Sequence, residues 1–119
     1  IRQYRPAIGK WLWEVPCGTI NPGESPLACA RRELAEETGV TGKLKRLKFF
    51  YSAPGFCNER MFCYTAHDLR PTRAHRDPDE RITVHRVAEP TARAWVRSGK
   101  VSDAKTLVCL LAWVARDRS

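Results

Sequence analysis

Short blocks in which apolar and polar residues alternate dominate the chain, and this spacing is typical of half-buried β-strands. Such blocks, rich in aromatic and β-branched residues, predict strands over 1–5, 11–15, 44–53, 60–67 and 82–87. Segments rich in Pro, Gly and charged residues predict loops over 16–24, 53–59 and 70–81.

One segment breaks the alternation, because its apolar residues recur at helical spacing. These residues are Leu27, Ala30, Leu34 and Ala35. Ser25 is a favourable N-cap, and Pro26 is tolerated at the first helical position. Gly39 stands where a residue in the left-handed conformation commonly ends a helix. The pattern therefore predicts a helix over 26–38.

Two further helices are predicted near the end of the chain. Glu89-Pro90 begins a helix that ends near Gly99, and Ser102 or Asp103 caps the last one. The apolar stripe of that last helix is Leu107, Leu110, Leu111 and Val114. Strands interrupted by one helix and followed by terminal helices predict an α+β fold, arranged as an α/β/α sandwich. The length of 119 residues predicts a single domain over 1–119.

Composition narrows the classes of partner. The net charge is +8, but basic residues are dispersed rather than clustered, which favours attraction for small anions over a nucleic-acid groove. No apolar run approaches the ~20 residues that span a bilayer, so no membrane partner is expected. A rival hypothesis, nucleic-acid binding motivated by the charge, would show itself as tight binding that falls steeply with salt.

The cysteines indicate the cellular compartment of the protein, and the first residues indicate whether strands precede Ile1. The five cysteines form no C-x-x-C pair, so we interpret them as small buried hydrophobes in a reducing cytosol and predict a cytoplasmic protein. Ile1 begins within a strand pattern and no secretion signal precedes it, so we expect additional N-terminal strands before Ile1.

Carboxylates crowd one side of the helix over 26–38. Glu33 and Glu37 lie one turn apart, and Glu36 flanks the same face. Like charges at this spacing cost a few tenths of a kcal/mol each, which neighbouring Arg32 offsets only in part. A divalent cation is a fuller explanation, because clustered carboxylate oxygens suit Mg²⁺ or Mn²⁺. Taken alone, however, such a helix face is more often simply solvated.

The residues around these glutamates form a fixed frame, which favours the metal site over a merely solvated helix face. Gly18 is followed after five residues by Glu24, and after seven more by Arg32-Glu33-Leu34-Ala35-Glu36-Glu37-Thr38-Gly39-Val40. Seven fixed positions of this kind would coincide by chance with a probability on the order of 10⁻⁷ across the chain. Glu24 precedes the helix, where we expect it to hold the loop or to contact metal through water, rather than to bind metal directly.

This frame matches the box of the Nudix hydrolases at every fixed position, and the chain resembles their ADP-ribose pyrophosphatase branch over nearly its whole length. Looser matches to the branch are Gln3-Tyr4-Arg5, Trp13-Glu14-Val15-Pro16-Cys17-Gly18, Ser52-Ala53-Pro54-Gly55 with Glu59, and Gly99-Lys100-Val101-Ser102-Asp103-Ala104-Lys105-Thr106. Pro54 lies at about the offset from Gly39 that is associated with this branch. The resemblance implies a Nudix fold with a mixed β-sheet, one catalytic loop–helix and C-terminal helices.

The resemblance also assigns roles. Metal would be held by Glu33, Glu37 and Glu36, together with the backbone carbonyl of Cys17. The predicted catalytic residues are Glu80, Glu36 and Arg32, and the choice between Glu80 and a box glutamate as the base stays open. Substrate contacts are expected from Arg5, Gly18, Pro54 and Glu59.

The implied activity is Mg²⁺-dependent cleavage of ADP-ribose to AMP and ribose 5-phosphate, with Mn²⁺ as a substitute, by a homodimer. One alternative is another nucleoside diphosphate derivative, either a nucleotide sugar such as GDP-mannose or a dinucleoside polyphosphate. A second is a non-catalytic binding module on the same fold. Such modules typically lose box glutamates, whereas this chain retains them all.

Overall fold

The computed structural model describes residues 1–75 and 81–116. Its strands are β1 (Arg2–Arg5), β2 (Lys10–Trp13), β3 (Val40–Tyr51), β4 (Arg60–Pro71) and β5 (Ile82–Thr83). Its helices are α1 (Pro26–Thr38), α2 (Glu89–Ser98) and α3 (Ala104–Val114). All three predicted helices are confirmed, and α1 has the predicted bounds.

Local sequence accounts for both ends of α1. The Ser25 side chain accepts a hydrogen bond from the Ala28 N–H at 3.1 Å, and Pro26 occupies the first turn. Gly39 adopts φ 70° and donates its N–H to the carbonyl of Ala35 at 2.9 Å, the left-handed ending that glycine allows without strain. The C-terminal end of α1 is also bonded to the segment after β4, because the Thr72 N–H donates to the carbonyl of Gly39 at 2.8 Å.

The strands form two antiparallel sheets. One has the order β2-β1-β5, and the other is the long β3–β4 hairpin, whose register shifts at two places. Every strand pairing among the described residues is antiparallel, so the parallel pairing that the predicted mixed sheet requires is not seen there. The predicted strand over 82–87 is reduced to Ile82–Thr83, since only these residues pair with β1.

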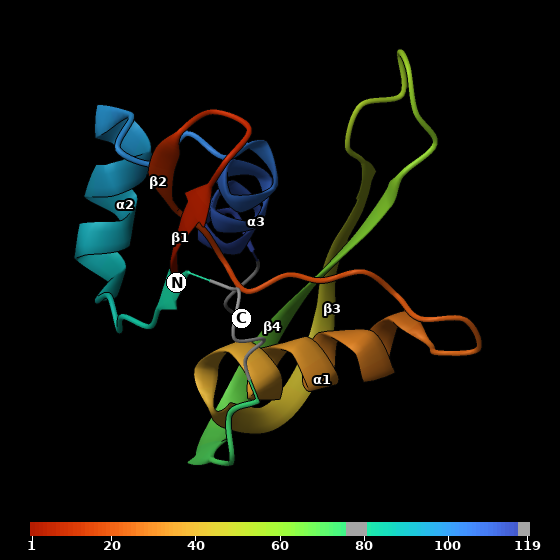
Figure 1. Cartoon of the computed structure of the whole chain (residues 1–119). Coiled ribbons are helices and arrows are strands. Elements are labelled where there is room, and N and C mark those ends of the chain that lie inside the picture. Colours follow the sequence, from red (N-terminus) through yellow and green to blue (C-terminus); the bar gives the residue numbers. More distant parts are fainter. Residues whose placement is uncertain (76–80, 117–119) are drawn as a thin grey trace.

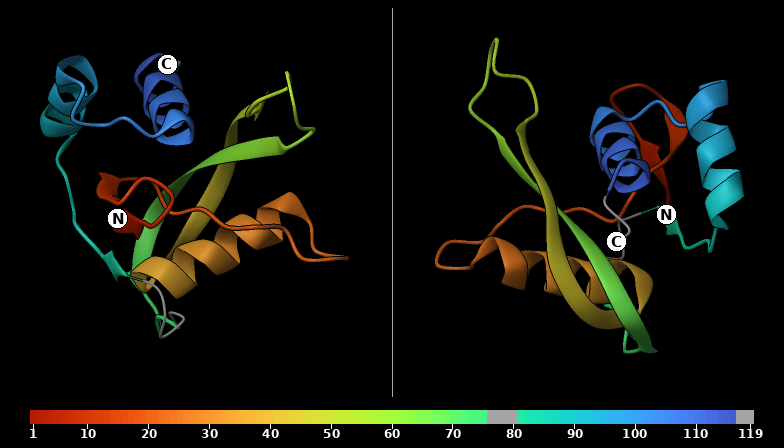
Figure 2. Two further views of the ribbon diagram at one scale, coloured as in Figure 1. Left: turned by 45° about the horizontal axis from the view of Figure 1, so that its top comes forward. Right: turned by 180° about the vertical axis from the view of Figure 1, so that it is seen from behind.

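Helices cover the strands from two sides (Figures 1 and 2). In the left view of Figure 2, α2 and α3 lie on one side of β1 and β2, and α1 lies on the other. The β3–β4 hairpin runs alongside, with α1 packed against β3 and α3 in contact with both hairpin strands. This arrangement confirms the α+β class with helices on both faces of the strands.

The described part of the chain buries few hydrophobic side chains. They are Cys29, Cys63, Ile82 and Val101. A pocket of about 380 Å³ is lined by residues of β2, β3, β4, α2 and α3. Aromatic residues on it include Trp13, Tyr64, Trp95 and Trp113. Among the residues that the structure describes, the helices lack the length and apolar character needed to cross a membrane.

Candidate active site

Arg32 organises the loop–helix segment, residues 18–40, by binding three carboxylates. Its Nε and Nη2 donate to the two oxygens of Glu24 at 2.8 and 3.0 Å, a bidentate pair. Its Nη1 donates to Glu33 Oε1 at 2.8 Å and to Glu36 Oε2 at 3.1 Å. Nη2 also reaches the carbonyl of Thr19 at 3.2 Å. One guanidinium therefore holds the loop and the helix carboxylates together.

Glu24 performs the loop-holding role expected of it. Besides the Arg32 pair, its Oε1 accepts the N–H of Asn21 at 3.1 Å. The hydrogen bonds from Arg32 and from the Asn21 backbone lower the pKa of Glu24 to about 2. The hydrogen bonds to Glu24 and then to Glu33 raise the pKa of Arg32. Since the donors of Arg32 are directed at protein acceptors, the geometry favours a positioning role for it over the predicted catalytic one.

Gly18 lies directly against the carboxylate of Glu33. A Cβ built at Gly18 would be 2.0 Å from Glu33 Oε1, closer than any real contact. Only glycine permits this approach, so the loop backbone and a helix carboxylate meet with no side chain between them. A side chain at Gly18 would force the Glu33 carboxylate to move from this position, while the predicted contact of Gly18 with substrate stays a prediction.

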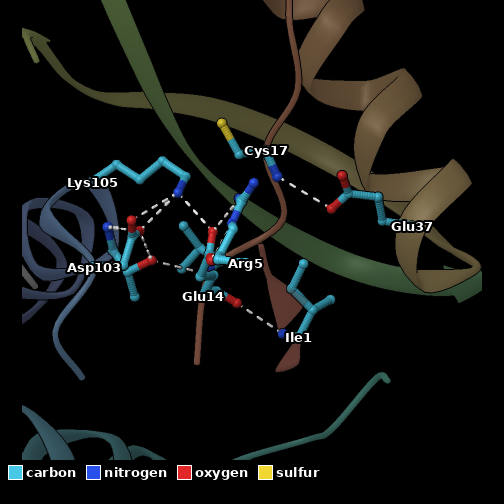
Figure 3. Close-up of polar contacts among 9 residues, drawn as sticks. Ile1, Arg5, Glu14, Cys17, Glu37, Asp103 and Lys105 are labelled. Carbon is cyan, nitrogen blue, oxygen red and sulfur yellow. Dashed lines mark hydrogen bonds and ion pairs between the residues drawn. The ribbon is translucent and has the colours of Figure 1, made fainter. Parts of the chain in front are cut away.

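Glu37 joins the loop to the helix on the buried side. Its residue exposure is 6%, and its Oε2 accepts the N–H of Cys17 at 3.2 Å (Figure 3). Burial raises the pKa of the Cys17 thiol, which disfavours a thiolate. The predicted use of the Cys17 carbonyl as a metal ligand stays a prediction.

A metal site is not preassembled in the described ranges. Within residues 1–75 and 81–116, no three side chains of His, Cys, Asp or Glu converge closely enough to hold an ion. Arg32 supplies positive charge to Glu33 and Glu36 instead, using one oxygen of each. The chemistry of the donors nevertheless suits a divalent cation, because Glu33, Glu36 and Glu37 are carboxylates on one helix and Glu33 lies against the loop backbone at Gly18.

A second cluster, the Glu14 cluster, consists of Arg5, Glu14, Asp103 and Lys105 (Figure 3). The Glu14 side chain is only 1% exposed. Arg5 donates to both of its oxygens at 2.8 and 2.6 Å, and Lys105 Nζ donates to Glu14 Oε1 at 2.7 Å. Lys105 also binds both oxygens of Asp103 at 2.9 Å. Two cations and two anions are therefore balanced beside the start of the loop.

The start of α3 anchors this cluster. Asp103 is the N-cap, and its Oδ2 accepts from the backbone N–H of Thr106 at 3.1 Å and from its hydroxyl at 2.6 Å. Thr106 Oγ1 in turn accepts the N–H of Val15 at 3.1 Å. The segment that leads from β2 into the loop is therefore attached to a helix 91 positions further along the chain.

Charge pairing outweighs burial in this cluster. Burial alone would raise the pKa of Glu14, but the hydrogen bonds from Arg5 and Lys105 leave it below its ordinary value. Burial would likewise lower the pKa of Lys105, yet its bonds to Glu14 and Asp103 raise it. The hydrogen bond to Glu14 also raises the pKa of Arg5. Arg5, predicted to contact a substrate phosphate, is thus paired with Glu14 in this structure.

The remaining predicted residues are not brought to the loop–helix segment. Pro54 and Glu59 are exposed in the turn between β3 and β4, which lies well away from α1 in all views (Figures 1 and 2). Glu80 lies outside the described residues. The predicted roles of these three residues stay predictions.

Sequence reasoning missed Glu14 and Lys105 as individual residues. Both stood inside motifs used only for their resemblance. A usable signal existed for Glu14, because a charged residue between Trp13 and Val15 in a strand pattern is expected to need a partner when buried. The identity of that partner depends on the tertiary fold.

Comparisons with known proteins show which family the chain resembles. A family model described as NUDIX domain matches residues 1–106. The "ADP-ribose pyrophosphatase" of Bacillus subtilis (strain 168) is 38% identical over 109 residues, which cover 89% of this chain and 59% of that protein. The "Methanol dehydrogenase activator" of Bacillus methanolicus is 31% identical over 113 residues, covering 92% and 61%.

A solved structure is also similar. The chain matches a "Crystal structure of ADP compounds hydrolase" with a TM-score of 0.86 and 26% identity, over 95% of this chain and 62% of that one. This chain thus spans about three fifths of the length of these relatives.

Proposed function

The chain belongs to the Nudix hydrolase family, and we propose that it hydrolyses the diphosphate of ADP-ribose to AMP and ribose 5-phosphate. The observation that carries this proposal is the complete loop–helix segment, in which Arg32 positions Glu24, Glu33 and Glu36 while Glu37 holds Cys17. The relative at 38% identity, whose name states this substrate, supports the choice of ADP-ribose.

The reaction requires water and a means of handling negative charge. Water attacks one phosphorus and the bridging P–O bond breaks. The two products, AMP and ribose 5-phosphate, are phosphate monoesters, and the attacking water gives up a proton. Mg²⁺, or Mn²⁺ in its place, would be held by Glu33, Glu36 and Glu37 with the backbone at Cys17. When bound, it would draw charge from the phosphoryl oxygens and help to ionise water.

The protein's own groups have separate tasks in this proposal. Arg32 keeps the helix carboxylates in place, and Gly18 lets the loop lie against Glu33. Arg5 offers its fork of N–H groups to a phosphate. The proton of the attacking water goes to Glu80 or, in the alternative, to Glu36. Gly18, Pro54 and Glu59 remain proposed substrate contacts, and a homodimer is the proposed assembly.

The test is a panel of ADP-ribose, GDP-mannose and diadenosine polyphosphates, with Mg²⁺ and with excess EDTA, and with products identified by chromatography. We expect AMP and ribose 5-phosphate from ADP-ribose, no turnover in EDTA, and the highest kcat/KM for ADP-ribose. A tenfold higher kcat/KM for another compound would leave the family assignment unchanged and show that ADP-ribose is not the preferred substrate. Undiminished turnover in EDTA would overturn the metal requirement, and no turnover of any compound would favour a binding module.

A further inference from the structure

One oxygen of Glu14 accepts hydrogen bonds from two cations. Arg5 Nη2 lies 2.6 Å and Lys105 Nζ 2.7 Å from Glu14 Oε1. The two cations differ in exposure, since the Arg5 side chain is 39% exposed and that of Lys105 is 19% exposed. Arg5 can therefore turn towards solvent or a ligand, whereas Lys105 is enclosed.

Lys105 is also held more firmly than Arg5. Its ammonium contacts Glu14 Oε1 and both oxygens of Asp103, while Asp103 is fixed as the N-cap of α3. Arg5 has carboxylate contacts only with Glu14 among the contacts that the structure describes for it. If one cation leaves Glu14, it will be Arg5.

Arg5 stands beside the loop that enters the proposed active site. Figure 3 shows Arg5 beside the chain that carries Cys17, three residues after Glu14, and Lys105 beside Asp103. Both cations are close enough for their charges to interact with the Cys17 side chain. Cys17 itself bonds to Glu37 of the loop–helix segment. A diphosphate bound at that segment would thus compete with Glu14 for Arg5.

Departure of Arg5 would be costly if Glu14 had no other partner, because a buried carboxylate without a counter-charge is strongly unfavourable. We propose that Lys105 is a positioning residue that keeps Glu14 neutralised, so that Arg5 can exchange from Glu14 onto the substrate diphosphate. The exchange matches the chemistry of the two side chains, because the guanidinium fork fits phosphate oxygens and the ammonium serves as a compact fixed charge. This inference rests on the proposed function.

The first test is Lys105→Met, with kcat and KM measured separately. With Lys105 absent, Arg5 becomes the main counter-charge of Glu14 and is less available, so KM should rise about five- to tenfold with kcat within twofold. Lys43→Met is the matched control, because it removes the same charge from an ion pair with Asp68 whose side chains are 80% and 72% exposed. Its KM should equal that of the wild type.

The second test removes the charge that holds Arg5. Glu14→Gln should lower KM at least twofold, and the pair Glu14→Gln with Lys105→Met should return KM to the wild-type value or below it. A merely structural role for Lys105 predicts lower thermal stability without this reversal of KM. The inference is overturned if Lys105→Met changes kcat and not KM, or if Glu14→Gln raises KM. Lack of any turnover by the wild type would instead refute the proposed function.

Discussion

The loop–helix segment and the Glu14 cluster both consist of Arg or Lys bound to carboxylates, but they are assembled at different distances along the chain. Arg32 binds Glu24, Glu33 and Glu36, all within eight positions of it. In the Glu14 cluster, Lys105 reaches Glu14 across 91 positions. The first arrangement is local and the second exists only in the folded chain.

They also differ in burial. In the loop–helix segment the carboxylate side chains of Glu24 and Glu36 are 16% and 37% exposed, whereas that of Glu14 is 1% exposed. Partly exposed carboxylates can exchange a cation with solvent, while a buried ion pair is a fixed part of the structure. Glu37 is the exception in the loop–helix segment, because it is 6% exposed. In the Glu14 cluster, the buried carboxylate and Asp103 attach the start of the loop to α3.

The largest expected effect comes from Glu37→Gln in the loop–helix segment. The amide oxygen can still accept the Cys17 N–H, but the charge proposed to hold metal is lost, so kcat should fall by roughly 10²–10⁴ with little change in stability. Steady-state kinetics at saturating Mg²⁺ and thermal unfolding measure the two quantities. Glu89→Gln, which removes a charge paired with Arg93 on α2, is the control and should retain full activity. Full activity of Glu37→Gln would remove this residue from the metal site.

A smaller effect, on stability, is expected from Glu14→Leu in the Glu14 cluster. Removing one partner of a buried ion pair costs ~3–5 kcal/mol. Here we expect about 2 kcal/mol, because Lys105 keeps Asp103 and Arg5 can turn to water. Urea unfolding at neutral pH gives this value. A loss below about 0.5 kcal/mol, typical of a surface change, would show that the cluster does not hold the loop.

The loop–helix segment, whose contacts are local, was largely predictable from the sequence, whereas the Glu14 cluster, whose partners are far apart in the chain, was not. The bounds of α1 follow from Ser25, Pro26 and Gly39, whose effects act within one turn. The spacing of Glu33, Glu36 and Glu37 likewise required only helical geometry. The bidentate contact of Arg32 with Glu24 was not foreseen in detail, but the loop-holding role of Glu24 was.

Errors arose where partners come from elsewhere in the fold. The strand predicted over 11–15 ends at Trp13, because the N–H of Val15 bonds to the hydroxyl of Thr106 on α3 and not to a strand. The strand predicted from 82 to 87 ends at Thr83, the last of its residues that pairs with β1. The hairpin strand β3 begins earlier than predicted and ends at Tyr51, before the predicted 53, while β4 continues to Pro71, which pairs with Val40. Alternation in sequence cannot identify the partner of a strand.

The smallest expected effect is the pH-dependent one of Glu24→Gln. The pKa of Glu24 is about 2 in the folded chain and 4.5 as the ordinary value, so its carboxylate stabilises the fold above pH 4.5. That contribution is lost as the pH falls from about 4.5 towards 2, where the folded protein also takes up the proton. Unfolding curves of the wild type and Glu24→Gln should therefore differ at neutral pH and converge as the pH approaches 2. The difference should also shrink with added salt, because the Arg32 side chain is 28% exposed.

Asp68→Asn, in the exposed pair with Lys43, should show no resolvable difference at any pH. A gap between wild type and Glu24→Gln that stayed constant from pH 7 to pH 2 would mean that Glu24 holds the loop through hydrogen bonds that an amide also makes, and that its charge contributes nothing.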